Sequence, residues 1–387
     1  MNHPRLTILA PSFSYPHRAG ASVHIANAVR ELSRSFATRF YCLNQQPEAM
    51  QWGDMADWCV ETAAFRPQPQ RRLTLDPPAV WLDHAPALIH HCEQQWRVQP
   101  PDLVQIEFTS MLDYAKLARR FGAKVICTAH NVAFLAQIRR ANAEPSPKIR
   151  LRRWLGALSL FQYELRKLRH CDLVITLNEV DRAMVLRWLP RLNVHAVPSG
   201  MNLSEWRVCR HPQPKPEILF VGNYHHPPNV EGALWLAHEV LPLVVRERPD
   251  ARLILAGRAP TQAVRDCAND QIHVTGDVAD MRDLYARASV VAAPIFWGSG
   301  VRIKILEALA CGLPLVTTSL AAEGIDLQHE TDALFANDAS SFAAALVRVL
   351  NHAELRQRLG DAGRAVIERE YDWHQIGARL TQLYQQL

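Results

Sequence analysis

The feature that most constrains the fold is an alternation of short apolar strands with amphipathic helices, which occurs in two separate series. This rhythm is typical of parallel α/β sheets covered by helices on both faces. The first series of expected strands is Leu6–Ala10, Thr38–Cys42, Leu103–Glu107, Lys124–Thr128, Leu173–Leu177 and Val194–Val197. The second is Glu217–Val221, Arg252–Ala256, Ile272–Thr275, Ser289–Ala293 and Leu315–Thr317. With 387 residues, the chain is long enough for two such domains.

A proline-rich segment separates the two series. Residues 207–216 contain Pro212, Pro214 and Pro216, and alternate prolines continue neither a helix nor a central strand. We therefore expect a first domain over residues 1–206, a linker over 207–216, a second domain over 217–371 and a terminal helical segment over 372–387.

Composition and motifs exclude several classes of protein. The eight cysteines form no Cys-x-x-Cys pair, which argues against a zinc ribbon or a disulfide framework and favours reduced thiols in the cytoplasm. No secretion signal and no membrane-spanning run is expected. The sequence also has no zinc finger, RNA-recognition signature or basic heptad region, so nucleic acid is not an expected partner.

One segment is strongly basic. Residues 139–170 contain nine Lys and Arg against two Asp and Glu, and Leu151, Trp154, Leu158 and Phe161 recur there at helical spacing. Two interpretations remain open: a helix that lies on an anionic membrane surface, or a core helix with a solvated basic edge.

Ligands of open parallel sheets bind beyond the carboxyl ends of the strands. Two such places in the first series stand out. Gly20, after the first strand, allows close approach of backbone to a ligand at a helix start, where free amides hold an anion. His130, after the strand that ends at Thr128, can hydrogen-bond a substrate hydroxyl or stabilise developing charge.

The most specific motif lies between Pro294 and Pro314. A buried strand ends in a Gly-Ser-Gly turn, and the following helix carries Arg302, Lys304 and Glu307. Cations in a first helical turn oppose the helix dipole, so this arrangement indicates an anionic ligand such as a diphosphate. Glu307, one turn later, is placed to accept hydrogen bonds from ribose hydroxyls.

Together these pieces resemble glycosyltransferase family 4. The resemblance adds Tyr163-Glu164, Val197–Asn202, Phe220–Asn223, Val274–Asp277 and Ile305–Gly312, in family order. It implies the GT-B fold, that is, two Rossmann-like, doubly wound parallel-sheet domains facing a central cleft, with the last helix packed back on the first domain. It also implies a retaining, metal-independent hexosyltransferase that needs no cofactor and uses a nucleotide diphosphate sugar as donor.

The resemblance implies a role for each site residue, and these are listed here by role. The catalytic set is His130, Gly20, Arg302 and Lys304; the donor-binding set is Gly20, Gly222, Asn223, Gly276, Ser299, Gly300, Arg302, Lys304 and Glu307; the acceptor-binding set is His24, Glu107 and Asn131; no metal ligand is expected. The acceptor would be a glycan or a lipid-linked glycan in surface polysaccharide or glycolipid assembly, and the protein would be cytoplasmic and peripheral to the membrane.

The sequence departs from the common family pattern in two places. Ser299 stands where many members carry a second glutamate, and the loop after Val221 lacks their Arg and Lys. Other functions therefore stay open: a nucleotide-sugar epimerase of the same fold, a dinucleotide-dependent oxidoreductase, or a non-catalytic membrane adaptor. The oxidoreductase lacks its Gly-x-Gly-x-x-Gly fingerprint, and the adaptor does not account for the ordered site residues.

Overall fold

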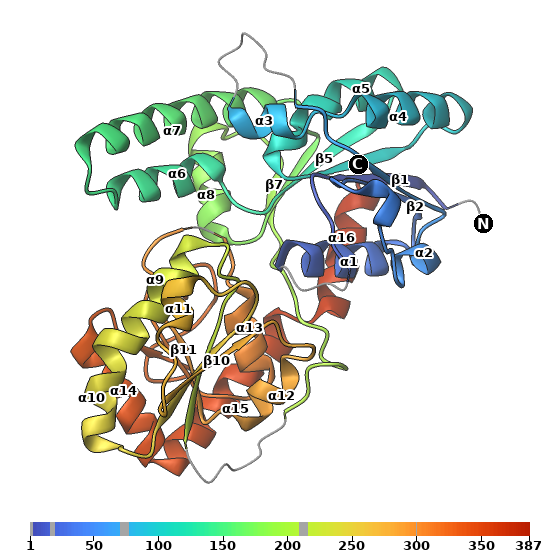
Figure 1. Cartoon of the computed structure of the whole chain (residues 1–387). Coiled ribbons are helices and arrows are strands. Elements are labelled where there is room, and N and C mark those ends of the chain that lie inside the picture. Colours follow the sequence, from blue (N-terminus) through green and yellow to red (C-terminus); the bar gives the residue numbers. More distant parts are fainter. Residues whose placement is uncertain (1–2, 16–19, 70–76, 209–215, 299) are drawn as a thin grey trace. The chain divides into compact units, whose positions relative to one another are not determined.

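The computed structural model describes residues 3–15, 20–69, 77–208, 216–298 and 300–387 (Figure 1). The chain divides into two compact units, each built on one parallel sheet. Unit 1 comprises Met1–Ser199 with Trp373–Leu387, and unit 2 comprises Gly200–Asp372. Residues 200–206, which the sequence analysis assigned to the first domain, thus belong to unit 2, and most of the expected linker, residues 209–215, lies outside the described residues.

Unit 1 has a seven-stranded sheet in the order β3-β2-β1-β4-β5-β6-β7, with all neighbours parallel. Its elements are β1 (Arg5–Ala10), α1 (Gly20–Leu32), β2 (Ala37–Leu43), η1 (Pro47–Ala49), α2 (Met55–Trp58), β3 (Glu61–Phe65), α3 (Pro78–Leu82), α4 (Pro86–Val98), β4 (Leu103–Glu107), η2 (Thr109–Tyr114), α5 (Ala115–Arg120), β5 (Lys124–Ala129), α6 (Ala133–Asn142), α7 (Pro147–Leu168), β6 (Leu173–Thr176), α8 (Glu179–Trp188), β7 (Val194–Ala196) and α16 (Trp373–Gln385).

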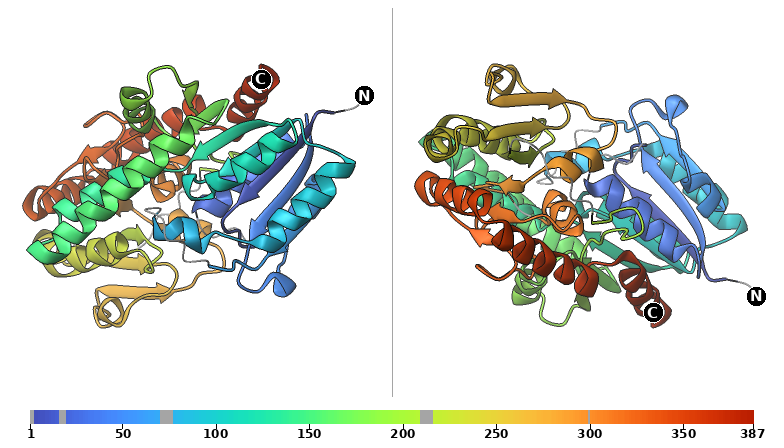
Figure 2. Two further views of the ribbon diagram at one scale, coloured as in Figure 1. Left: turned by 90° about the horizontal axis from the view of Figure 1, so that it is seen from above. Right: turned by 90° about the horizontal axis from the view of Figure 1, so that it is seen from below.

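Helices cover both faces of this sheet. Seen from above, α4, α5 and α7 lie over one face (Figure 2), while α1 and α16 pack together in the core of the other. Alternate residues of β1 enter different cores, because successive side chains of a strand point to opposite faces: Leu9 packs with α4 and α5, and Ile8 packs with α1 and α16. Both faces are therefore buried, as the apolar strands predict.

The terminal helix α16 is an integral part of unit 1. Trp373, Ile376, Leu380 and Tyr384 follow helical spacing and are all buried against the sheet and α1. At Gly377 the two helices approach so closely that a Cβ atom would lie 2.4 Å from a side-chain carbon of α1. Only glycine permits this contact.

Unit 2 has a six-stranded parallel sheet in the order β10-β9-β8-β11-β12-β13. Its elements are β8 (Glu217–Val221), α9 (Pro227–Trp235), the π-helix η3 (Leu236–Val240), α10 (Leu241–Glu247), β9 (Arg252–Ala256), α11 (Gln262–Arg265), β10 (Ile272–Gly276), α12 (Arg282–Arg287), β11 (Val290–Ala293), α13 (Ile303–Ala310), β12 (Leu315–Thr317), β13 (Leu334–Phe335), α14 (Ala339–Asn351) and α15 (Ala353–Glu370).

The structure contains two strands that the sequence analysis did not identify, β3 and β13. Each lies at an edge of its sheet. β3 reads Glu-Thr-Ala-Ala-Phe and is only half-buried along its whole length, and β13 is two residues long. Neither presents the apolar run that marks a central strand.

Candidate functional site

The centre of the site in unit 1 is His130, which follows the carboxyl end of β5. Its Nε2 lies 2.6 Å from Glu107 Oε2 at the end of the neighbouring strand β4. The imidazole stacks flat on Phe108, with ring centroids 4.0 Å apart and planes 4° apart. Phe108 has φ = 67°, a left-handed conformation that is strained for a non-glycine residue. This backbone geometry and the carboxylate together fix the orientation of His130.

A second row of polar side chains supports Glu107. Gln105 Nε2 donates to Glu107 Oε1 and, over 3.2 Å, to Thr128 Oγ1. The side-chain oxygen Oε1 of Gln105 accepts a 2.7 Å hydrogen bond from the hydroxyl of Tyr384 in α16. All four side chains are buried, so residues far apart in the sequence form one continuous network behind His130.

His24 of α1 lies on the other side of His130. The two rings meet edge to face with centroids 4.9 Å apart, and His24 also packs against Trp373 of α16. Burial, with a smaller effect of His130, holds the pKa of His24 well below its usual value of 6.5, so this imidazole is neutral. Its Nδ1 is buried without a hydrogen-bond partner in the described structure.

Among the described residues of this unit, His24, Glu107 and His130 form a group that could hold a metal ion. Each offers one ligand atom, and these atoms lie within 4.8 Å of one another. However, the Glu107–His130 hydrogen bond joins two of the three candidate ligands directly. In this structure Glu107 and His130 therefore form a carboxylate–imidazole pair, and the neutral imidazole of His24 lies beside it.

The remaining residues expected in the first domain occupy the same end of the sheet. Gly20 is the exposed first residue of α1, and Asn131 follows His130 directly and is half-buried. Residues 16–19, in the loop before Gly20, lie outside the described residues. Glu107 has no exposed surface, and both its carboxylate oxygens accept hydrogen bonds from protein groups, so it is not available for the direct acceptor contact that we expected.

In unit 2 the loop after β8 is held by backbone packing and by its own amide side chains. Gly222 donates its N–H to Ala256 O over 2.9 Å, and a Cβ atom on Gly257 would lie 2.1 Å from Gly222 O. The side-chain oxygen of Asn223 accepts from the backbone of His225 in its own turn. The carbonyl of Asn223 accepts a 2.8 Å hydrogen bond from Asn229 Nδ2. Asn223 therefore shapes the loop through local hydrogen bonds.

Lys304, in the first turn of α13, points towards this loop. Its ammonium group donates to Asn229 Oδ1 over 2.7 Å and lies 4.5 Å from the ring centre of Phe220 in β8. Burial lowers the pKa of Lys304 from 10.5 to about 7; Glu307 opposes this shift, and Arg302 adds to it. Because desolvation disfavours the ammonium form, an anion bound beside Lys304 would be favourable.

Glu307 lies one turn further along α13. Its Oε2 accepts a 2.8 Å hydrogen bond from the hydroxyl of Tyr285 in α12. Burial raises the pKa of Glu307 above its usual value, against the opposing effects of Tyr285 and Lys304. Within the described part of the chain, Glu307 Oε1 has no hydrogen-bond partner. One oxygen is therefore fixed by tyrosine, and the other can accept from a ligand.

Arg302 caps the amino terminus of α13, with extended backbone, and does not lie within its first turn as expected. Its Nη1 donates to Gly300 O over 2.5 Å. Gly300 has φ = 85° and Gly276, at the end of β10, has φ = 70°, and both conformations favour glycine. Ser299, expected to bind the donor, lies outside the described residues.

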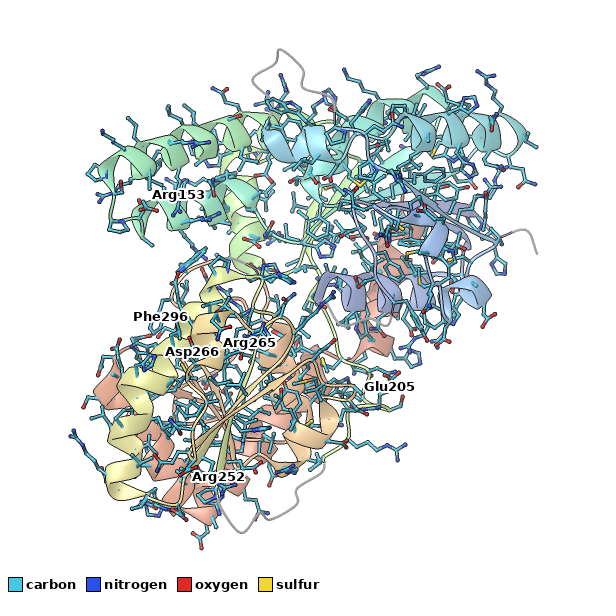
Figure 3. The ribbon with its side chains drawn as sticks, viewed as in Figure 1. Arg153, Glu205, Arg252, Arg265, Asp266 and Phe296 are labelled. Atoms are coloured by element: carbon cyan, nitrogen blue, oxygen red, sulfur yellow. The ribbon has the colours of Figure 1, made fainter. Side chains whose placement is uncertain are left out.

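A separate surface is formed by the helices α6 and α7, which lie side by side (Figure 1). Figure 3 shows Arg153 between these two helices, where it donates to Arg140 O and pairs with Glu144 at 2.8 Å. From Ile149 to Leu158, α7 carries five exposed large apolar side chains, whereas Tyr163 and Leu168 near its end are buried. The exposed residues are Ile149 (46%), Leu151 (63%), Trp154 (41%), Leu155 (61%) and Leu158 (53%).

Two models of glycosyltransferase families match this chain. A model of family 4 glycosyltransferases matches residues 18–205, and a model of group 1 glycosyl transferases matches residues 215–352. Together they cover both units. The chain belongs to glycosyltransferase family 4. The family that the order of motifs suggested is thus confirmed.

Two curated relatives of this family 4 member each match about half of it. One is an uncharacterised 44.6 kDa protein in the cps region of Klebsiella pneumoniae, 25% identical over 52% of this chain and 52% of the relative. The other is the phosphatidyl-myo-inositol mannosyltransferase of Mycobacterium leprae, 30% identical over 49% of this chain and 52% of the relative. The chain spans about half the length of these relatives.

The fold comparison extends over the whole chain. The structure of HepE from Anabaena in complex with UDP-glucose matches with a TM-score of 0.71 and 14% identity, covering all of both chains. The expected GT-B fold is therefore confirmed. Within the described residues, no helix of this family 4 member is both long and apolar enough to cross a membrane.

Proposed function

We propose that this family 4 glycosyltransferase moves a hexosyl group from a nucleotide diphosphate sugar to an acceptor hydroxyl, with retention of configuration and without a metal. The observation that carries the proposal is the placement of Lys304, whose ammonium group lies against Asn229 and the ring of Phe220 and whose pKa burial lowers from 10.5 to about 7. Lys304 and Arg302 would hold the diphosphate, and the free oxygen of Glu307 would accept from ribose hydroxyls.

In this proposal His130 acts on the transferred sugar. Its orientation is fixed by Glu107 and Phe108, so it needs no rearrangement to stabilise charge as the donor bond loosens. Cations at the diphosphate stabilise the leaving group, and the acceptor hydroxyl attacks from the same face. Positioning and electrostatics would supply the catalysis.

The nature of the relatives supports a lipid-linked or surface-glycan acceptor. One relative is a phosphatidyl-myo-inositol mannosyltransferase, and the other is encoded in a cps region. We propose that this chain likewise works in glycolipid or surface polysaccharide assembly, in the cytoplasm at the inner face of the membrane.

The exposed face of α7 supports this location. Leu151, Trp154, Leu155 and Leu158 follow i, i+3, i+4, i+7 spacing and so form one stripe. The exposed cations Lys148, Arg150 and Arg152 flank this stripe on its two sides. An apolar stripe between basic residues fits an interfacial helix on anionic lipid, with the rings and leucines inserted and the cations at the headgroups.

The activity test uses purified protein with EDTA, a panel of UDP- and GDP-sugars, and lipid-linked acceptors. We expect acceptor-dependent release of the nucleoside diphosphate that EDTA does not abolish. Conversion of the donor without any acceptor would instead identify an epimerase. No turnover and no nucleotide binding across the panel would refute the transferase.

The membrane test is sedimentation with vesicles that contain or lack anionic lipid. We expect binding to anionic vesicles only, and its loss in the double variant Leu151→Glu with Leu155→Glu. Arg152→Glu should weaken binding to anionic vesicles, and added salt should weaken this binding further. Arg153 is unsuitable for this test because its side chain holds α6 to α7. Equal binding to neutral vesicles, or unchanged binding of the double variant, would refute the proposal.

A further inference from the structure

The hydrogen-bond network behind His130 has a defined direction. It begins at Tyr384, whose hydroxyl donates to Gln105 Oε1 over 2.7 Å. Burial, and to a smaller extent Glu107, raises the pKa of Tyr384 well above its usual value, so the hydroxyl keeps its proton. Because the carbonyl end of Gln105 is occupied by this donor, its NH₂ group faces Glu107 Oε1 and Thr128 Oγ1.

The donor and acceptor roles of the network also determine the hydrogen bond between Glu107 and the imidazole of His130. A carboxylate that accepts from Gln105 on one oxygen is an acceptor on the other as well. Glu107 Oε2 therefore accepts from His130, and the proton of this 2.6 Å hydrogen bond is carried by Nε2. In the neutral imidazole the lone pair is then on Nδ1.

We propose that Tyr384, Gln105 and Glu107 are positioning residues that fix His130 as its Nε2–H tautomer, so that Nδ1 is the ring atom that faces the substrate. The role of Nδ1 rests on the proposed transferase function. The tautomer itself does not, because it follows from the hydrogen bonds alone. The terminal helix α16 thereby contributes to the chemistry of a histidine that precedes Tyr384 by more than half of the chain.

Among the described residues, Glu107 is the hydrogen-bond partner of His130 Nε2, and two rings pack on the rest of the imidazole. Phe108 covers one face of the imidazole at 4.0 Å and offers no hydrogen-bonding group. His24 meets the ring at its edge and is neutral. Glu107 is therefore the partner that decides which nitrogen carries the proton.

The direct test is ¹⁵N NMR of the full-length protein labelled at histidine, with the His130 signals identified by their loss in His130→Ala. We expect a protonated Nε2 and an unprotonated Nδ1 at high pH. In Glu107→Gln, the oxygen of the new amide should accept from Gln105 Nε2, and its NH₂ group should donate to His130 Nε2. The proton should then move to Nδ1. Tyr384→Phe frees Gln105 to turn over and should give a mixture of both tautomers.

One variant serves as a matched control. Tyr41→Phe removes a buried tyrosine hydroxyl that donates to Glu61 over 2.7 Å. Tyr41 lies in unit 1 but outside the network, so the His130 signals should not change. A His130 proton on Nδ1 in the parent protein, or the same tautomer in all variants, would overturn the proposal.

Kinetics give a second readout. Enzymes that lose the carboxylate partner of a catalytic histidine lose activity through the wrong tautomer. We expect kcat of Glu107→Gln to fall at least about tenfold and that of Tyr384→Phe several-fold, with the donor KM unchanged. Unchanged kcat together with a reversed tautomer would refute the role of Nδ1. A parent protein that shows the expected tautomer but no transfer would instead refute the proposed function.

Discussion

The lowered pKa of Lys304 predicts that donor affinity depends steeply on pH. Its pKa of about 7 means that about half of the unliganded molecules carry a neutral amine at pH 7, and about 99% do at pH 9. A diphosphate favours the ammonium form, because the charged hydrogen bond replaces the lost hydration. Binding above pH 7 therefore takes up a proton, and affinity falls as pH rises.

The magnitude follows from this difference in protonation. If the pKa of Lys304 stays above 9 in the complex, binding weakens by about 50-fold between pH 7 and pH 9. A nucleotide diphosphate sugar such as UDP-glucose is the suitable probe, since its phosphates do not titrate in this range. Calorimetry in buffers of different ionisation enthalpy measures both the affinity and the proton uptake.

Lys304→Arg is the matched control, because guanidinium keeps its charge over the whole range. Its affinity for the nucleotide sugar should be almost independent of pH. The nucleoside, which lacks phosphates, should also bind equally at pH 7 and pH 9. If the parent protein binds UDP-glucose equally at both pH values, or if the arginine variant keeps the parent's slope, the phosphates do not contact Lys304.

Three further predictions concern single residues. His130→Ala should keep donor binding but lower transfer by about a hundredfold or more, as measured by initial rates; near-normal turnover would exclude a catalytic role. Arg302→Ala should weaken nucleoside diphosphate binding by about 1.5–3 kcal/mol and leave nucleoside binding unchanged, whereas Glu307→Gln should weaken both; calorimetry with the two ligands distinguishes these patterns. Gly377→Ala should lower the melting temperature by several degrees, since its Cβ would lie 2.4 Å from a side-chain carbon of α1. Gly156→Ala in α7, whose Cβ would lie 3.6 Å from the nearest side-chain atom, should leave the melting temperature equal or higher. Equal effects of the two substitutions would refute the packing argument.

Much of the fold could be predicted because its central strands are buried on both faces. Such strands appear in the sequence as short apolar runs, and Leu6–Ala10 and Arg252–Ala256 are examples. Edge strands carry no such signal, as β3 demonstrates. Helical spacing also does not distinguish a core face from an exposed one, so the stripe at Leu151 and Trp154 could be assigned only from the structure.

Positions in the candidate site could be located from the sequence only in part, for a related reason. His130 and Lys304 follow strands or begin helices, and these positions can be located from the sequence. Their partners come from other elements. Gln105 and Glu107 are alternate residues of a buried strand, and polar residues spaced in this way were an available signal for a network. The contribution of Tyr384, 279 residues from Gln105, leaves no local pattern.

The membership of α16 in unit 1 has a consequence for biosynthesis. During synthesis the ribosome completes the whole of unit 2 before it adds the last helix. Until then, the apolar surface of the nascent sheet and of α1 that receives Trp373, Leu380 and Tyr384 is uncovered. The first unit to emerge is thus the last to be finished, and its apolar face is available to chaperones throughout that interval.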